Sequence, residues 1–278
     1  MSPMPVPTPD IAALRSRLSA LERGAGHSAH GFVSLGHAAI DGALGGGLAR
    51  GALHEVFAPS ADAASAAGFA IALALRVADA RPILWVRHDF SSVETGGLYA
   101  PGLFEMGLSP DRLILVQAHD GPDVLRAAEE VARCPPLGAA VIEPWGEPRA
   151  LDLTATRRLA LAAETSGVPL IMLRLAATPA PSAATTRWEV RPAPSAPLEP
   201  NAPGYPTFAV TLARRKAGAG EKSWIVEWNR DRREFRNPGS ASSASIGSDD
   251  ASLSGGVVSF PVDGSPETPM GGARRRTA

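Results

Sequence analysis

The chain has 278 residues, of which 45% are hydrophobic and 20% charged, and its formal net charge is −1 at pH 7. This length fits one large domain or two small ones, and the apolar share is enough for a sizeable buried core. The near-neutral balance excludes a protein that is a polycation or a polyanion as a whole. A single cysteine, Cys134, excludes a disulfide framework and any Cys-x-x-Cys metal or redox motif.

The first ten residues contain four prolines and no basic residue, which is unlike a signal peptide. The sequence has no uninterrupted run of about 18 apolar residues, so we expect no membrane-spanning helix. These features predict a cytoplasmic protein with no membrane contact. Only two of the 27 basic residues are lysines, Lys216 and Lys222, so lysine chemistry is excluded from the first 215 residues.

Residues 1–30 are predicted to form an amphipathic helix followed by a linker. Thr8 is the expected N-cap, and Gly24 is expected to end the helix. One narrow apolar stripe runs along it at 3-4-3 spacing, formed by Ile11, Leu14, Leu18 and Leu21. The stripe either packs on its own domain or docks onto another protein, and we take its four residues as candidate partner contacts.

Residues 31–236 alternate short apolar runs with helical segments, which predicts strand–helix–strand units in an α/β fold. The expected strands are Leu53–Phe57, Ile83–His88, Leu113–Gln117, Ala139–Glu143 and Pro169–Leu175. The expected helices are Ala63–Ala78, Pro122–Cys134 and Asp152–Thr165. Because the strands are continuous apolar runs, we expect a mainly parallel central sheet with helices on both faces.

The character of the chain changes after Pro179. A proline-rich stretch to Pro203 contains one strand-like piece, Thr186–Val190. Two alternating segments, Thr207–Ala213 and Ser223–Trp228, then flank a turn and predict an antiparallel hairpin at the sheet edge. Residues 237–278 are rich in Ser, Gly and Pro, and we predict a disordered tail there.

A nucleotide-binding loop would lie where the strand Leu53–Phe57 leads into the next helix. Such a loop needs Gly-x-x-x-x-Gly-Lys-[Ser/Thr], because backbone N–H groups cradle the phosphates and the lysine reaches the terminal ones. The stretch Ala58–Ala67 has no glycine and no lysine, and Asp62 would repel phosphate. The sequence therefore predicts no catalytic residue, no cofactor site and no ATP hydrolysis.

Metal sites are also poorly supported. Glu143 ends an apolar strand, where an acid holds Mg²⁺ through water in some proteins; the alternative is a carboxylate that faces solvent or pairs with an arginine. Because the phosphate loop is missing, we favour the alternative. His27 and His30 lie in a glycine-rich linker and are interpreted as solvated, while Cys134 is interpreted as a packing residue. No metal site is predicted.

Between positions 205 and 236, eight basic residues stand against four acidic ones, and Trp224 and Trp228 are interleaved with them. Patches of this kind contact nucleic-acid phosphates. The candidate contacts to DNA, single-stranded DNA in particular, are Arg214, Arg215, Lys216, Arg230, Arg232 and Arg233. The alternative is an arginine-rich edge hairpin that resists aggregation, with the tryptophans in the core.

From about Gly31 to Phe235 the order of these pieces resembles the RecA recombinase core. RecA-type proteins carry a turn of the form Gly-x-x-x-[Leu/Ile]-Asp-x-x-Leu-Gly-x-Gly-Gly, and this chain has Ile40, Asp41, Leu44 and Gly45–Gly47 in that order. The chain departs from RecA at the phosphate loop, where Ala and Ser replace Gly, Lys and Thr. It also lacks a clear catalytic glutamate after the strand that ends at His88.

A RecA-like chain without these ATPase parts is similar to the ImuA family, which is grouped loosely with the SOS cell-division inhibitor SulA. ImuA proteins are encoded with a Y-family polymerase homologue, ImuB, and an error-prone replicative-type polymerase. The resemblance implies a non-enzymatic accessory role in DNA-damage-induced SOS mutagenesis and translesion synthesis. It implies contacts with RecA and an ImuB-type homologue, and indirect ones with the error-prone polymerase. Two alternatives stay open: a SulA-like cell-division inhibitor, and a RecA-like NTPase with an atypical nucleotide loop.

Overall fold

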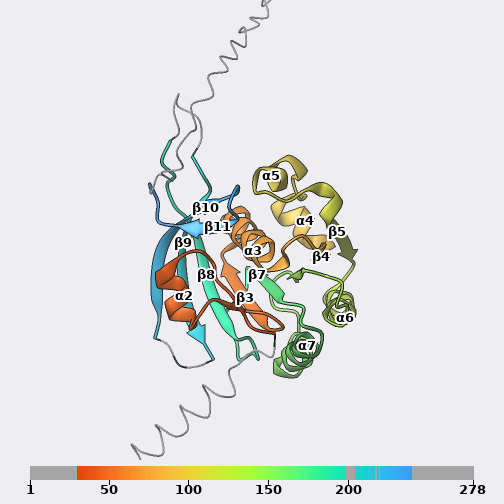
Figure 1. Cartoon of the computed structure of the whole chain (residues 1–278). Coiled ribbons are helices and arrows are strands. Elements are labelled where there is room, and N and C mark those ends of the chain that lie inside the picture. Colours follow the sequence, from red (N-terminus) through yellow and green to blue (C-terminus); the bar gives the residue numbers. More distant parts are fainter. Residues whose placement is uncertain (1–29, 198–203, 217, 219, 240–278) are drawn as a thin grey trace, which may run out of the picture. The chain divides into compact units, whose positions relative to one another are not determined.

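The computed structural model describes residues 30–197, 204–216, 218 and 220–239 (Figure 1). The chain divides into two compact units, Met1–Ser240 and Ala241–Ala278, and every described residue lies in the first. The predicted N-terminal helix, with Ile11, Leu14, Leu18 and Leu21, lies outside the described residues. The same holds for the predicted tail beyond Gly239.

One sheet of nine strands organises the described part, in the order β11-β10-β9-β8-β3-β7-β6-β4-β5. All neighbouring pairs from β8 to β5 are parallel, and β9, β10 and β11 continue the sheet antiparallel. The bounds are β3 Leu53–Ala58, β4 Ile83–His88, β5 Leu113–Ala118, β6 Ala139–Glu143, β7 Leu170–Leu175, β8 Thr186–Pro192, β9 Thr207–Arg215, β10 Lys222–Asn229 and β11 Glu234–Arg236. The predicted mainly parallel sheet with an antiparallel hairpin edge is confirmed.

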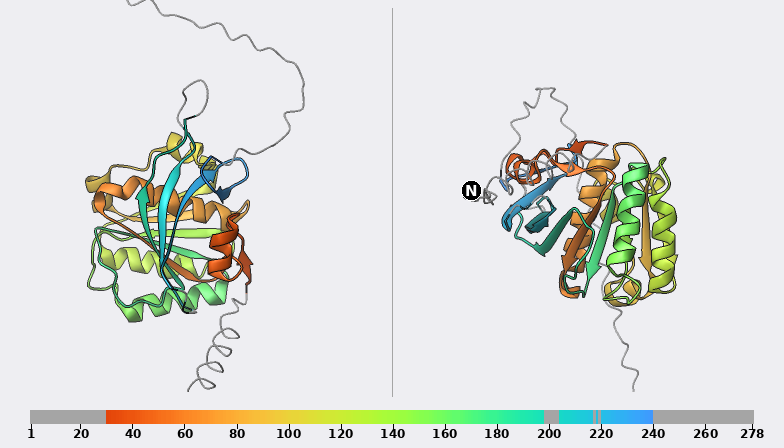
Figure 2. Two further views of the ribbon diagram at one scale, coloured as in Figure 1. Left: turned by 90° about the vertical axis from the view of Figure 1, so that its left-hand side faces the viewer. Right: turned by 90° about the horizontal axis from the view of Figure 1, so that it is seen from below.

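Helices cover both faces of this sheet (Figure 2). Helix α3 (Ala63–Ala78) packs on one face, whereas α6 (Gly121–Ala132) and α7 (Leu153–Ser166) lie side by side on the other. Successive side chains along the parallel strands point to opposite faces, so each strand contributes to both hydrophobic layers. Val56 packs in the layer with α3, and Leu53 packs in the layer with α6 and α7. This alternation explains the continuous apolar runs in the sequence.

Helix α3 is buried almost all round because the antiparallel end of the sheet also packs against it. Phe69 lies at the centre of an aromatic cluster, with ring centroids 5.6 Å from Trp188 and 5.3 Å from Phe235. The segment Ser60–Ala78 is long and apolar enough to cross a membrane, yet 61% of that window is buried inside the protein. The core therefore accounts for its apolar composition.

The structure contains short elements that the sequence patterns did not indicate. The stretch predicted as a glycine-rich turn contains α2 (Ala38–Leu44), which ends at Gly45 in the left-handed conformation with φ 78°. Strands β1 (Phe32–Val33) and β2 (Leu48–Ala49) pair on either side of it. Helices α4 (Asp89–Thr95) and α5 (Ala100–Glu105) lie between β4 and β5. Each of these elements has at most seven residues, too few for a periodic pattern to stand out.

Candidate functional site

The carboxyl end of β3 shows what replaces a phosphate loop. The strand ends at Ala58, a single 3-10 turn (η1, Ser60–Asp62) follows, and α3 begins at Ala63. The helix N-terminus has no side-chain cap, and its first turn presents Ala63, Ala64 and Ser65. This connection is too short to wrap a phosphate group and has neither the lysine nor the glycines that such wrapping needs.

Glu143, the strand-end acid of β6, is held by an arginine. Its carboxylate accepts hydrogen bonds from Arg87 Nε at 2.9 and 3.0 Å and from the Trp85 indole at 2.9 Å. The side chains of Arg87 and Glu143 are only 5% and 2% exposed. Burial raises the pKa of the Glu143 carboxyl, and the bonds from Arg87 and Trp85 oppose that change. The favoured alternative is a carboxylate that faces solvent or pairs with an arginine, and the structure shows the arginine pair.

Arg87 uses its other nitrogens to fix the segment that follows β4. Its Nη1 donates to Gly96 O at 2.8 Å, and its Nη2 donates to Thr95 Oγ1 at 2.7 Å. One guanidinium therefore joins β6 to the end of α4. Sequence reasoning missed Arg87, although a charged residue inside the apolar run of β4 was a signal that something must neutralise it.

A cavity of about 510 Å³ lies over this ion pair. Its walls come from the first turns of α3, the segment after α4 and the start of β9, with Gly68, Leu98, Tyr99 and Phe208 among the lining residues. Arg87 and Glu143 also line it, but both are already bonded to each other. The space between the first turns of α3 and the start of β9 is thus a mostly apolar hollow.

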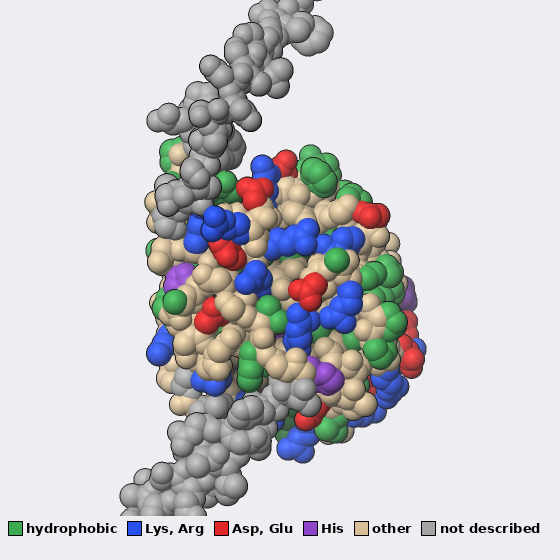
Figure 3. Space-filling view, in the orientation of Figure 1, with side chains coloured by type: hydrophobic (Ala, Val, Ile, Leu, Met, Phe, Trp, Pro, Cys, Tyr) green, Lys and Arg blue, Asp and Glu red, His purple; other side chains and the backbone are tan. Residues whose placement is uncertain are grey.

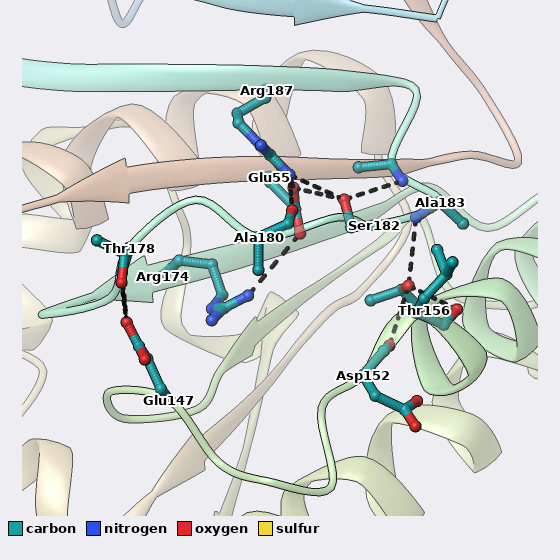
Figure 4. A network of polar contacts seen from close by, with 12 residues as sticks. Glu55, Glu147, Asp152, Thr156, Arg174, Thr178, Ala180, Ser182, Ala183 and Arg187 are labelled. Atoms are coloured by element: carbon teal, nitrogen blue, oxygen red, sulfur yellow. Dashed lines mark hydrogen bonds and ion pairs between the residues drawn. The ribbon is translucent and has the colours of Figure 1, made fainter.

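A second buried polar network lies on the α6–α7 face, at β3, β7 and β8 (Figure 4). Glu55 Oε2 accepts bonds from Arg187 Nη2 at 2.9 Å and from Ser182 Oγ at 2.8 Å, while Arg174 Nη1 lies 3.9 Å from Glu55 Oε1. Both guanidinium groups stack on the Phe57 ring, at 5.3 and 5.2 Å. Burial lowers the pKa of Arg174, and Glu55 offsets that change. This network ties three strands together.

The six candidate DNA contacts fall into two groups. Arg214, Arg215 and Lys216 lie at the β9–β10 turn, whereas Arg230, Arg232 and Arg233 lie at the β10–β11 turn, at the opposite end of β10. Eight residues of extended strand separate the turns, roughly 26 Å. Trp228 is fully buried and Trp224 packs against the core, so neither tryptophan is placed to stack on bases.

Exposed apolar side chains concentrate at the other edge of the sheet. The described residues include ten exposed large hydrophobic side chains, and six of them lie between positions 90 and 115: Phe90, Val93, Tyr99, Phe104, Ile114 and Leu115. They belong to α4, the segment after it, α5 and the edge strand β5, which lie together in Figure 1. We call this set the β5 surface. Ile114 and Leu115 are consecutive on β5, so their side chains project from opposite faces of the sheet at this edge. Exposed apolar side chains gathered at a sheet edge are typical of protein–protein contacts.

The remaining candidates have local roles. His30, described at the start of the structure, makes a 2.7 Å contact between its Nε2 and the Glu164 carbonyl oxygen. Cys134 is a free, partly buried thiol beside the α6–α7 layer. Among the residues that the structure describes, no three histidine, cysteine or acidic side chains are grouped closely enough to hold a metal ion.

Comparison with known proteins gives two kinds of similarity. The chain is 33% identical over 212 residues to Protein ImuA of Caulobacter vibrioides, in both strain NA1000 / CB15N and strain ATCC 19089 / CB 15, covering 70% of this chain and 82% of that protein. The crystal structure of the RadB recombinase aligns with 74% of this chain and 99% of that chain, at 16% identity and a TM-score of 0.49. No protein-family model matches the sequence.

The fold and the site together define an α/β protein with a mainly parallel sheet and no phosphate loop at the carboxyl end of its strands. At 33% identity over most of the relative's length, the chain belongs to the ImuA family.

Proposed function

We propose that the protein is a non-catalytic accessory factor in DNA-damage-induced mutagenesis and translesion synthesis, acting in the cytoplasm. It works by contacts with RecA and with an ImuB-type polymerase homologue, and through the latter with an error-prone polymerase. Membership of the ImuA family supports the biological setting. The Arg87–Glu143 ion pair supports the absence of catalysis, because the one strand-end acid at this position is neutralised and buried.

The observation that carries the proposal is the β5 surface. Strand β5 pairs with β4 on one side only, and its Ile114 and Leu115 side chains are 46% and 45% exposed. An apolar edge strand is an aggregation hazard unless a partner covers it, either side by side or by adding a strand. From Asp89 to Glu130 the chain carries eight acidic and two basic residues, so the partner surface is expected to be apolar with a basic border.

The test is capture of purified RecA and of the ImuB-type homologue by the full chain. Ile114→Asp places a charge on the β5 surface and is expected to weaken capture of at least one partner by tenfold or more, about 1.4 kcal/mol or greater. Leu161→Asp is the matched control, because Leu161 is 63% exposed on α7, away from β5. Leu14→Asp with Leu18→Asp tests the predicted N-terminal helix separately.

Capture of both partners at wild-type strength by Ile114→Asp, with the fold intact by circular dichroism, would contradict the proposed use of the β5 surface. Filamentous cells on overexpression would instead support a cell-division inhibitor. Loss of induced mutation on deletion, without filamentation, is the result that the proposal predicts.

A further inference from the structure

The carboxyl end of helix α3 gathers five arginines from four separate parts of the chain. They are Arg50, Arg76, Arg81, Arg112 and Arg233, and we call them the α3 arginine cluster. In Figure 3 several blue side chains surround an acidic one near the middle of the face shown. No local sequence motif predicts the cluster, because only the fold brings these residues together.

Asp79, the residue after α3, is the centre of the cluster. Arg50 donates from Nη1 to Val77 O at 2.7 Å and pairs through Nη2 with Asp79 Oδ2 at 3.0 Å. Arg112 Nη2 donates to Asp79 O at 2.6 Å and to Arg81 O at 2.8 Å. The last carbonyls of a helix have no partner within the helix and carry partial negative charge, so they fix these guanidinium groups in place.

The other members join through the β10–β11 turn. Arg233 Nη1 lies 3.5 Å from Asp79 O, and Arg76 Nη1 donates to Arg233 O at 3.3 Å. These two contacts hold the β10–β11 turn against the end of α3. Arg81 Nη1 lies 3.4 Å from Pro135 O. Asp79 and Arg233 both have positive φ, 53° and 51°.

The cluster carries more positive charge than helix capping requires. Five arginines face two nearby carboxylates, Asp79 and Asp111, which leaves a local excess of three positive charges. Burial lowers the pKa of Arg112, and the neighbouring positive charge of Arg233 lowers it further. The hydrogen bonds that Arg76, Arg81, Arg112 and Arg233 donate here go to backbone carbonyl oxygens, which carry only partial negative charge.

We propose that the α3 arginine cluster binds the phosphate backbone of a nucleic acid. Guanidinium groups match phosphate oxygens with two parallel bonds, and arginines already held by carbonyls lose little rotamer freedom on binding. Arg230 and Arg232 are exposed on the same turn as Arg233, but Arg230 pairs with Glu105 and Asp231, and Arg232 with Glu234, so the proposal rests on the five arginines alone. Five guanidinium groups exceed what one phosphate group can engage, so a repeating polyanion fits the cluster better than a lone anion does.

This site revises the DNA contacts expected from the sequence. Arg230, Arg232 and Arg233 lie on the turn that contributes to the cluster, whereas Arg214, Arg215 and Lys216 lie at the far end of the hairpin. The inference does not rest on the proposed function. A variant that loses nucleic-acid binding but still captures its protein partners would separate the nucleic-acid site from the proposed function. A variant that loses partner capture but still binds nucleic acid would do the same.

The experiment measures binding of the full chain to fluorescein-labelled oligo-thymidine and to a labelled duplex, by fluorescence anisotropy across a salt series. Arg81→Gln and Arg233→Gln are each expected to weaken binding several-fold and to lower the salt-dependence slope by about one phosphate contact. Arg126→Gln on α6 is the matched control, since Arg126 is exposed and pairs with Asp123 on the opposite face. The triple variant of Arg214, Arg215 and Lys216 to Gln is expected to match the wild type.

Asp79→Asn gives an effect of opposite sign. It removes a carboxylate charge from the middle of the cluster, and asparagine has nearly the same size and shape as aspartate. We expect tighter oligonucleotide binding and a steeper salt dependence.

Equal binding by wild type, Arg81→Gln and Arg233→Gln would overturn the proposal, as would loss confined to the Arg214–Lys216 variant. Displacement of the oligonucleotide by poly-glutamate as effectively as by unlabelled oligo-thymidine would also overturn it, in favour of an acidic protein partner. A variant that fails to fold is identified by circular dichroism, and Asp79→Asn then decides the question by its expected gain.

Discussion

The two ends of helix α3 differ in a way that reverses the usual expectation for a helix on a parallel sheet. Anions usually bind at the N-terminus, where free N–H groups and the dipole attract them. In this protein the N-terminal end presents alanines and a mostly apolar cavity, Asp62 precedes the first turn, and Glu143 in the cavity wall is bonded to Arg87. The C-terminal end collects five arginines on carbonyl oxygens.

The difference teaches that a helix end can provide positive charge by two routes. A phosphate loop uses the backbone, and its loss removes the anion site outright. An arginine cluster uses side chains that the negative end of the helix dipole attracts, so it forms where backbone binding of an anion is least favourable. The following predictions test whether the Arg87–Glu143 pair near the N-terminal end of α3 has a purely structural role. They also test whether the arginine cluster at the C-terminal end does more than stabilise the fold.

The largest effect on stability is expected for the Arg87–Glu143 pair near the N-terminal end of α3. Arg87→Ala leaves Glu143 buried without its partner and should lower the free energy of unfolding by about 3–5 kcal/mol. Urea unfolding measures it. The double change Arg87→Met with Glu143→Leu should cost much less than Arg87→Ala alone, because no buried charge is left. Arg158→Ala, which breaks an exposed pair with Glu129, is the control, at below about 1 kcal/mol. An Arg87→Ala variant as stable as this control would show that the ion pair does not hold the site.

His54, near the amino end of β3, gives the next largest effect. It is fully buried between Thr186 Oγ1 at 2.8 Å and Ala49 O at 2.9 Å, and burial lowers its pKa from 6.5 to about 4. The folded state therefore binds fewer protons than the unfolded state between these values. Its stabilisation is complete above pH 6.5 and is lost as the pH falls to about 4, amounting to about 3 kcal/mol.

Urea unfolding at a series of pH values checks this. The variant His54→Gln should be less stable than the wild type at neutral pH and should show a flatter dependence between pH 6.5 and 4. Parallel curves for the two proteins would mean that His54 does not titrate as its burial implies.

The smallest effect on stability is expected at the arginine cluster. Asp79 is 68% exposed, so Asp79→Asn should change the free energy of unfolding by less than about 1 kcal/mol. Thermal unfolding of the variant provides the measurement. A loss several times larger would indicate that the cluster serves mainly to close the end of α3, and would weaken the case for a ligand there.

The sequence predicted the larger elements well and the site only in part. Long apolar runs such as Ile83–His88 and Ala139–Glu143 match the observed strands residue for residue, because burial on both faces leaves a strong pattern. Helix α3 was predicted with its observed bounds, Ala63–Ala78.

What the sequence did not indicate depends on contacts across the fold. Arg87 and Glu143 are separated by more than fifty residues and meet only because β4 and β6 are neighbours in register. The α3 arginine cluster likewise joins residues from position 50 to position 233. The hairpin arginines were grouped because they are close in sequence. In the structure the extended strand β10 separates them, so the two groups lie at its opposite ends.

The most direct test of the central claim, that the carboxyl end of the sheet is closed to nucleotide chemistry, is calorimetric titration of the full chain with ATP and Mg²⁺, with and without single-stranded DNA. The account predicts no heat of binding in either case, since no phosphate loop exists between Ala58 and Ala63 and Glu143 is bonded to Arg87. Saturable binding that requires Mg²⁺ would contradict it, would make Glu143 a metal-site residue, and would reopen the case for an enzyme.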